Sequence, residues 1–450
     1  MDVWGDWLDM TTDASAPPMT DAAHQKQLRR AVIASTIGTA IEWYDFFLYG
    51  IVAGLVLAPL YFPTSDPLTG TFLAFSTFAV GFVARPIGAA IFGHYGDRIG
   101  RKASLVATLM LMGVATFAVA LVPAYDSIGL WGAVILTFLR FMQGVGVGGE
   151  WGGAVLMSME WAKTNTNRGF IASWPQFGVP LGLALANLVV LGVSLATGDD
   201  FLTYGWRIPF FLSLFLVGVG MYIRLGVVET PTFRKLQERN EIAAAPMLEV
   251  IKRHPKEILL SALARTGENA SFYIFTTFVL SYGTVHLKYS RDVLLEALLI
   301  AALLGFVWIP LSGWLSDRIG RRKMYLVGVS FTAVFAFVYF AIIGTSPAAT
   351  FVAIAISLLA HSMMYGPQAA LIAENFTGRL RYSGASIGYQ LTAIIAGGPA
   401  PIVATALLAR YGTGYAVAVY LLVCCVISFV ATLCLKDRTG RDIDSEQEYR

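Results

Sequence analysis

The sequence predicts an all-α polytopic membrane protein with twelve transmembrane helices in two pseudo-symmetric six-helix halves. Three observations lead to this fold class. Hydrophobic residues make up 56% of the 450 residues and charged residues only 14%, whereas a soluble domain averages roughly 45–50% and about 25%. Apolar segments long enough to cross a bilayer recur along the chain. One polar motif occurs twice, each time after an apolar segment, which indicates an internal duplication.

A transmembrane helix needs about 20 mostly apolar residues, and twelve segments meet this condition. The expected spans cover residues 31–58, 70–95, 103–123, 129–158, 169–197, 206–228, 258–286, 293–315, 324–344, 347–372, 383–409 and 414–435. They are too long and continuous for the alternating strands of a membrane barrel. The predicted organisation is therefore a lead (1–30), two halves (31–228 and 257–435), a central loop (229–256) and a tail (436–450).

Basic residues follow the even-numbered spans and are scarce after the odd-numbered ones. The odd-numbered connections carry only Lys288, Arg291 and Arg410. Since cytoplasmic connections are enriched in Lys and Arg, both termini are expected in the cytoplasm. The net charge of +3 is small for this length and gives no reason to expect a nucleic-acid partner. We expect a functional monomer in a lipid bilayer, without cofactor or metal.

The repeated motif is Gly-x-x-x-Asp-Arg-x-Gly-Arg-(Lys/Arg), at residues 93–102 and 313–322. The copies follow the second and eighth expected spans, which are equivalent places in the two halves. A weaker echo places an acid at the end of one span and an arginine at the start of the next, at Glu160 and Arg168 and at Glu374 and Arg381. Two related six-helix halves with a binding site between them are typical of transporters.

Carboxylates inside the first span are candidates for proton coupling. Glu42, Asp45 and Tyr49 are spaced to share one helix face, near the middle of the bilayer. A charge there costs roughly 2.5–3.5 kcal/mol on insertion scales. Glu150 and Gln143 place a second polar stripe on the fourth span. The carboxyls either carry protons or pair with buried arginines to hold helices together.

Arg85 and Arg140 lie deep inside the second and fourth spans. Arginine stays charged in proteins, so each needs an anionic partner. That partner is either an internal carboxylate (Glu42, Asp45 or Glu150) or the carboxylate of a substrate. An arginine fork binds carboxylates in a bidentate way, which favours organic acids as substrates.

The seventh span faces the first across the pseudo-symmetry and offers further polar residues. Arg265 and Glu268 are one turn apart and either satisfy each other or contact substrate, and Asn269 and Tyr273 continue that face. Weaker candidates for substrate contact are His361, Tyr365, Gln176 and Gln390.

The chain resembles the major facilitator superfamily, of which the paired motif is the most recognisable signature. Within it, the chain is similar to the metabolite:proton symporter family, which holds the bacterial shikimate, α-ketoglutarate, citrate and proline/betaine permeases. The matching stretches are residues 42–46, 85–88, 140–150, 206–210 and 229–233. Residues 381–385 and 388–390, and Arg265 followed by Glu268, look most like the shikimate permease branch.

This resemblance implies the major facilitator fold and proton-coupled uptake of a small organic acid by alternating access, in a bacterial inner membrane. It also implies a cytoplasmic gate in which Asp97 contacts the eleventh span and Arg101 contacts Glu160, with a copy in the second half. The gate residues implied are Gly93, Asp97, Arg98, Gly100, Arg101, Lys102, Glu160, Arg168, Asp317, Arg318, Arg321, Glu374 and Arg381.

Other functions remain open from the sequence. A zwitterionic osmolyte such as proline or betaine is the alternative cargo, and a non-transporting membrane sensor is a different class. An enzyme is not expected, because the sequence has no metal-spaced His/Cys cluster and no nucleophile motif.

Overall fold

The computed structural model describes residues 20–63, 67–162 and 167–443. The first half holds a long helix α2 that continues through a π-helical turn, η1, into α3, followed by five further spanning helices and one short helix. These elements are α2 (Asp21–Val52), η1 (Ala53–Leu57), α3 (Ala58–Tyr61), α4 (Pro67–Arg98), α5 (Arg101–Leu121), α6 (Tyr125–Ile128), α7 (Trp131–Met159), α8 (Arg168–Thr197) and α9 (Ile208–Leu225).

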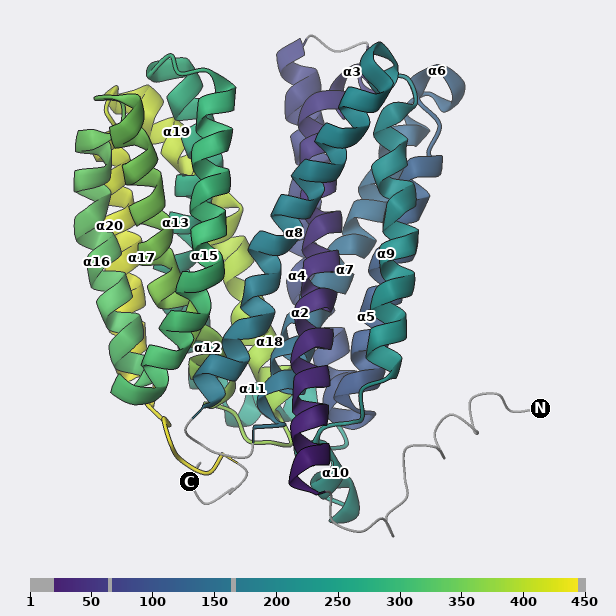
Figure 1. Cartoon of the computed structure of the whole chain (residues 1–450), viewed down its shortest axis with the longest axis vertical. Helices are drawn as coiled ribbons and strands as arrows, with labels where there is room; N and C mark the ends of the chain where they lie inside the picture. Colours follow the sequence, from purple (N-terminus) through teal and green to yellow (C-terminus); the bar gives the residue numbers. More distant parts are fainter. Residues whose placement is uncertain (1–19, 64–66, 163–166, 444–450) are drawn as a thin grey trace.

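The second half repeats this pattern with more irregular helices. Its elements are α12 (Pro255–Ala264), α13 (Thr266–Tyr273), η4 (Ile274–Phe278), α14 (Val279–Ser281), η5 (Tyr282–His286), α15 (Arg291–Ile319), α16 (Arg321–Ile342), α17 (Pro347–Ala373), α18 (Arg381–Thr392), η6 (Ala393–Gly397), α19 (Pro399–Tyr411) and α20 (Gly414–Cys434). The two bundles diverge toward the top of Figure 1 and meet toward the bottom. The most extensive packing between them is that of α8 against α15 and α17, and of α4 against α18.

Ten helices in the described part of the chain are long and apolar enough to cross a membrane. They match the expected spans other than the first and the seventh. Those two are formed by α2 to α3 and by α12 to η5, and each carries buried charged residues at mid-length. The twelve-helix architecture predicted from the sequence is confirmed.

The connection at 229–256, expected as a loop, contains two short helices, α10 (Pro231–Glu238) and α11 (Pro246–Arg253). Each helix begins with a proline at its first position, which suits a residue without a backbone N–H. α11 contacts both α4 and α18, so it lies beneath the junction of the halves (Figure 1). We call this end of the molecule, where the two bundles meet and α11 lies, the latch end.

The repeated motif forms a tight helix junction, with most of its residues inside helices. Residues 93–98 are the last turns of α4, and Arg101 begins α5. Gly100 and Gly320 have φ values of 114° and 102°, a region that side-chain-bearing residues rarely adopt. Glycine at these two positions lets each helix pair reverse direction within two residues.

Helices α4 and α7 approach so closely that glycine is required along the contact. A Cβ on Gly148 would collide with the backbone carbonyl of Arg85, and a Cβ on Gly88 with that of Val145. Small residues of this kind let helix backbones pack directly in membranes. The contact fixes Arg85 and the polar face of α7 relative to each other.

We expect Gly148→Ala to lower the thermal stability of the purified protein, because the methyl group meets backbone that cannot move aside. Overpacking of this kind costs about 1–3 kcal/mol. Gly218→Ala is the matched control, since a Cβ there meets nothing within 4 Å. A thermal-shift measurement in which both variants melt together would contradict this account of the α4–α7 contact.

Candidate substrate and proton site

Two arginines lie buried in a cage of aromatic rings within the first half. Arg85 on α4 is 5% exposed and Arg140 on α7 is fully buried. The ring of Phe46 on α2 contacts both guanidinium groups, since its centroid is 4.3 Å from Cζ of Arg85 and 4.2 Å from Cζ of Arg140. The other rings within about 5 Å are Phe82 and Trp43 at Arg85, and Tyr49 and Phe78 at Arg140. Ring faces attract cations, so the cage favours the charged guanidinium without neutralising it.

Among the described residues, neither of these arginines forms an ion pair with a carboxylate. The Nε and Nη2 atoms of both side chains are buried and have no hydrogen-bond partner. Arg140 donates from Nη1 to the amide oxygen of Gln143 at 3.1 Å. Buried charges are normally paired, and an unpaired one is expensive. The two guanidinium groups therefore keep unused hydrogen-bond donors at Nε and Nη2.

Asp45 is linked to Arg140 through a short chain of hydrogen bonds. Gln143, which accepts from Arg140, donates to the hydroxyl of Thr116 at 2.8 Å, and Thr116 in turn lies within hydrogen-bonding reach of the Asp45 carboxyl. Ser213 on α9 donates to Asp45 at 2.6 Å. The second Asp45 oxygen is buried without a partner, so this carboxyl can accept a proton beside the arginine cage.

Glu42 and Asp45, expected on one helix face, belong to two separate clusters. Glu42 lies beside Glu150 on α7, within hydrogen-bonding reach of its carboxyl. Glu150 forms an ion pair with Arg224 near the end of α9, and Arg224 also donates to the carbonyl of Leu105. The sequence interpretation missed Arg224. Its only sequence signal is a basic residue just inside the end of the sixth span, where most such residues reach the membrane surface.

The second half contains a satisfied polar cluster between α13, α17 and α18. Arg265 and Glu268 are paired at 3.2 Å, as the one-turn spacing allowed. Glu268 also contacts Nε2 of His361 at 2.8 Å and accepts from Gln368 at 3.1 Å. Arg265 lies 3.3 Å from the centroid of the Tyr389 ring. These groups hold one another, so this half offers fewer free polar atoms than the first.

Residues expected to contact substrate also bridge the halves. Trp151 on α7 stacks on Tyr389 of α18 with ring centroids 3.6 Å apart, and its indole donates to Gln176 at 2.8 Å. Gln176 donates to the carbonyl of Tyr365, and Gln390 donates to that of Val147. The two glutamines join helices of opposite halves on the latch side of the cage.

Three remaining candidates lie around the cage and the second-half cluster. Tyr273 packs edge-on against Phe82, the ring beneath Arg85, with centroids 5.6 Å apart. Asn269 is 9% exposed, and its Oδ1 is buried without a partner. Tyr365 stacks on His361 at 4.9 Å. Tyr273 is thus the second-half candidate that lies nearest the arginine cage, through its contact with Phe82.

The first copy of the motif joins α4 to α18. The Asp97 carboxylate accepts from the backbone N–H groups of Tyr382 and Ser383 at 3.2 and 2.8 Å. Asp97 also pairs with Arg101 at 3.3 Å, and Arg101 pairs with Glu160 at 3.4 Å. These are the contacts that the family resemblance implies. A carboxylate at a helix N-terminus gains from both the unpaired N–H groups and the helix dipole.

The second copy repeats these contacts with the halves exchanged. Asp317 accepts from Gly169 and Phe170, the first residues of α8, at 2.9 and 2.8 Å. Arg321 pairs with Asp317 at 2.8 Å and with Glu374 at 2.7 Å. Two ion pairs cross between the halves, Arg381 to Glu160 at 3.2 Å and Arg168 to Glu374 at 3.1 Å. We call these contacts together the latch.

Not every motif residue enters the latch. Arg98 and Arg318 are exposed, and Arg318 lies over the ring of Trp314. Lys102 donates to the carbonyl of Leu225, and its backbone N–H bonds the Glu229 carboxylate at 3.0 Å. Burial raises the pKa of the Glu229 carboxyl above its usual value, although the backbone N–H groups of Thr230 and Lys102 and the charge of Arg101 act to lower it. Gly93 lies against the backbone of Ser383, so its lack of a side chain permits the close approach of α18.

Comparison with known proteins agrees with this geometry. Residues 36–398 and 309–447 match the Major Facilitator Superfamily. The chain belongs to the major facilitator superfamily. This is a family of membrane transporters, so the expectation of a polytopic transporter is confirmed. Within residues 20–63, 67–162 and 167–443, no group of three or more His, Cys, Asp or Glu side chains is arranged to hold a metal ion.

The chain is 39% identical over 433 residues to the shikimate transporter of Escherichia coli, covering 95% of this chain and 99% of the relative. It is 32% identical over 431 residues to the proline/betaine transporter of Escherichia coli, covering 93% and 85%. A solved structure of the proton:xylose symporter XylE, bound to 6-bromo-6-deoxy-D-glucose, aligns with a TM-score of 0.75. It has 17% identity and covers 95% of this chain and 100% of that one, which shows the shared fold.

We expect Asp97→Asn to loosen the latch, because the substitution removes the charge that pairs with Arg101 and holds the start of α18. Ser386 is buried against Gly152 between the halves, so a cysteine there reports opening. In a chain whose three native cysteines are replaced by alanine, the labelling rate of Ser386→Cys should rise about tenfold, which corresponds to ~1.4 kcal/mol.

Arg98→Gln is the control, because Arg98 belongs to the same motif but is exposed. If Arg98→Gln raised the labelling rate of Ser386→Cys as much as Asp97→Asn does, motif charge in general, and not the Asp97 contacts, would control closure of the latch.

Proposed function

We propose that this protein is a proton-coupled symporter that takes up a small organic acid, such as shikimate or another mono- or dicarboxylate, by alternating access. The observation that carries the proposal is the pair of buried guanidinium groups, Arg85 and Arg140, with no carboxylate partner among the described residues. An anion that enters this site gains two charge-assisted forks and relieves two unpaired charges. The 39% identity to a shikimate transporter supports a carboxylate as cargo.

The proposed orientation assigns the latch end to the cytoplasm of a bacterial cell and the protein to its inner membrane. The basic residues of the even-numbered connections gather at that end, in agreement with the positive-inside rule. With the latch closed, Trp151 and Tyr389 stacked and α11 beneath the junction, the described conformation is closed toward the cytoplasm. Opening toward the cytoplasm then requires the latch to break.

Coupling follows from the chain of contacts between Arg140 and Asp45. A substrate carboxylate beside the guanidinium groups adds negative charge near Asp45, which favours protonation of Asp45. Linkage is reciprocal, so a proton on Asp45 strengthens substrate binding by the same factor. Arg140 is thus proposed to couple substrate binding to protonation of Asp45. Arg85, beside Tyr273 of the second half, is proposed to bind the substrate at the interface between the halves.

A zwitterionic osmolyte such as proline or betaine is the second candidate, since a relative with 32% identity transports proline and betaine. Aromatic cages bind quaternary ammonium groups well. Here, however, Phe46 and its neighbouring rings already hold two arginine cations. A further cation beside them would be repelled, so the charge balance favours an anion.

Purified protein in proteoliposomes should accumulate radiolabelled shikimate when an inward proton gradient is imposed, and a protonophore should abolish the accumulation. The physical reason is that a gradient of the co-transported proton is the only energy source in the vesicle. A parallel panel of α-ketoglutarate, proline and betaine identifies the cargo class. Uptake that is unaffected by the protonophore would reject proton coupling.

Asp45→Asn should abolish gradient-driven accumulation while sparing exchange of internal for external substrate, because exchange returns the carrier loaded and needs no change in protonation. Asp126→Asn, an exposed position on α6, is the control. Loss of accumulation and exchange to the same extent would assign Asp45 to substrate binding or to structure.

A further inference from the structure

A cluster of three charged groups lies apart from the arginine cage, between α2, α7 and α9. Glu42, Glu150 and Arg224 are only 1%, 2% and 3% exposed. Arg224 pairs with Glu150, and the Thr39 hydroxyl donates to the same carboxylate at 3.5 Å. Both oxygens of Glu42 are buried and have no hydrogen-bond donor as a partner.

Counting charge in this cluster leaves one carboxylate without a counter-ion. One guanidinium balances one carboxylate, and a second ionised carboxylate would stand unpaired inside the bundle at a cost of several kcal/mol. Glu42 nevertheless lies within hydrogen-bonding reach of Glu150. Two ionised carboxylates only accept hydrogen bonds, so this contact is favourable only when one of them carries a proton.

Other charged or titratable groups around the cluster do not supply the missing positive charge. Asp45 faces α9 from the same helix as Glu42. Lys102 on α5 lines a nearby cavity, but its ammonium group donates to the carbonyl of Leu225. Tyr382 on α18 covers the cluster from the second half, and its hydroxyl donates to the carbonyl of Gly149 at 2.8 Å.

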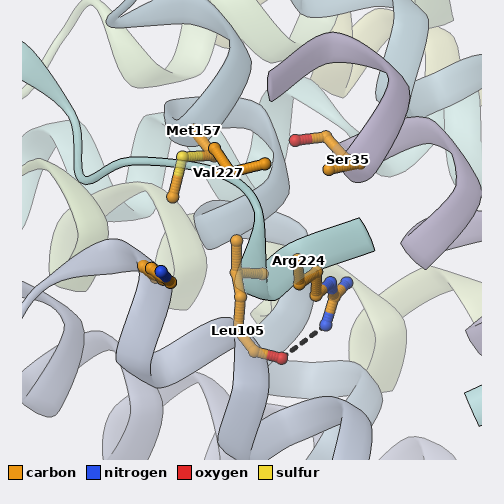
Figure 2. Close-up of a pocket in the computed structure, with 7 residues that line it drawn as sticks. Ser35, Leu105, Met157, Arg224 and Val227 are labelled. Carbon is orange, nitrogen blue, oxygen red and sulfur yellow. Dashed lines mark hydrogen bonds between the residues drawn. The ribbon is translucent and has the colours of Figure 1, made fainter. Parts of the chain in front are cut away.

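A small cavity lies beside Arg224. It is lined by Ser35, Lys102, Leu105, Met157, Arg224 and Val227, among others, and has a volume of about 10 Å³, close to what one water molecule needs. Figure 2 shows the Arg224 side chain in this cavity, bonded to the carbonyl of Leu105. Lys102, which also lines the cavity, lies in the first turn of α5, next to the motif junction.

We propose that Glu42 and Glu150 form a second proton-binding site. In the latch-closed state the two carboxyls share one proton. Arg224 is the positioning residue, because its single positive charge balances one ionised carboxylate and so leaves room for only one proton on the pair. The site is distinct from Asp45 and rests on the proposed function only for its role in coupling. The proton leaves through the water-sized cavity beside Arg224 when the latch opens.

Tyr382 provides the link between this site and the latch. Its backbone N–H donates to Asp97, while its ring fills the space left by Gly96, Gly152 and Gly153. Any movement of α18 that breaks the Asp97 contact therefore also withdraws the phenol from Gly149, next to Glu150. Water then reaches the carboxyl pair, and hydration favours the ionised form.

The test is infrared spectroscopy of the purified protein in lipid, which needs no substrate. The carbonyl stretch of a protonated carboxylic acid should persist at neutral pH in the wild type and in Asp45→Asn. The part of the signal that remains in Asp45→Asn should be lost in Glu42→Gln and equally in Glu150→Gln, because the remaining carboxylate then pairs with Arg224. In Arg224→Gln the signal should grow about twofold, since neither carboxylate keeps a counter-ion.

The shared-proton site is overturned if the signal is unchanged in Glu42→Gln, or if Asp45→Asn removes all of it. Glu42→Gln is nearly isosteric and neutral, so it keeps the test decisive even if Arg224→Gln does not fold. The latch link predicts that Asp97→Asn shifts loss of the signal to lower pH, and an unchanged titration overturns that link. Failure of proton-driven uptake would reject the proposed function and leave this measurement standing.

Discussion

The cost of an unpaired charge inside the bundle is the constraint on which this structure depends. Where the protein must be held shut, two buried carboxylates pair with an arginine of the opposite half, Glu160 with Arg381 and Glu374 with Arg168. Such pairs contribute little net stability against desolvation, but breaking one of them without replacement is costly. Ion pairs of this kind suit a gate. A partly open state with one broken pair is strongly disfavoured, whereas the closed state gains little net stability from the intact pairs.

The two halves use this constraint differently. In the second half, Arg265, Glu268 and His361 form a closed set that needs no ligand. In the first half, the arginine cage has positive charge to spare, and the Glu42–Glu150 pair has negative charge to spare. The latch is thus duplicated between the halves, whereas the interior charge is not.

The sequence predicted the twelve spans, the duplicated motif and the buried charges, because these rest on local composition and spacing. It could not predict pairings that depend on helix rotation and packing. Helical spacing placed Glu42 and Asp45 on one face, yet three residues differ by about 60° around a helix. That difference is enough for Glu42 to meet Glu150 while Asp45 meets Ser213.

Arg224 and Tyr382 were missed for related reasons. An arginine near a span end usually reaches the membrane surface, whereas this one turns inward and places its guanidinium against Gly38 on α2. Tyr382 has no sequence signal beyond its place after Arg381. Its importance comes from the three glycines that receive its ring, and contacts between glycine and aromatic side chains on different helices are set by packing alone.

Tyr382 also links the latch contact of α18 to the surroundings of Glu150. Its main chain bonds the latch and its side chain seals the neighbourhood of Glu150, and the two contacts are made by the same residue. A conformational change coupled through a single residue needs no extended pathway, since both contacts break in one movement of α18. The duplicated counterpart at Gly169 and Phe170 makes the same kind of latch contact, with the Asp317 carboxylate. The proposed release of the proton is therefore tied to the first-half latch, where Tyr382 makes both contacts.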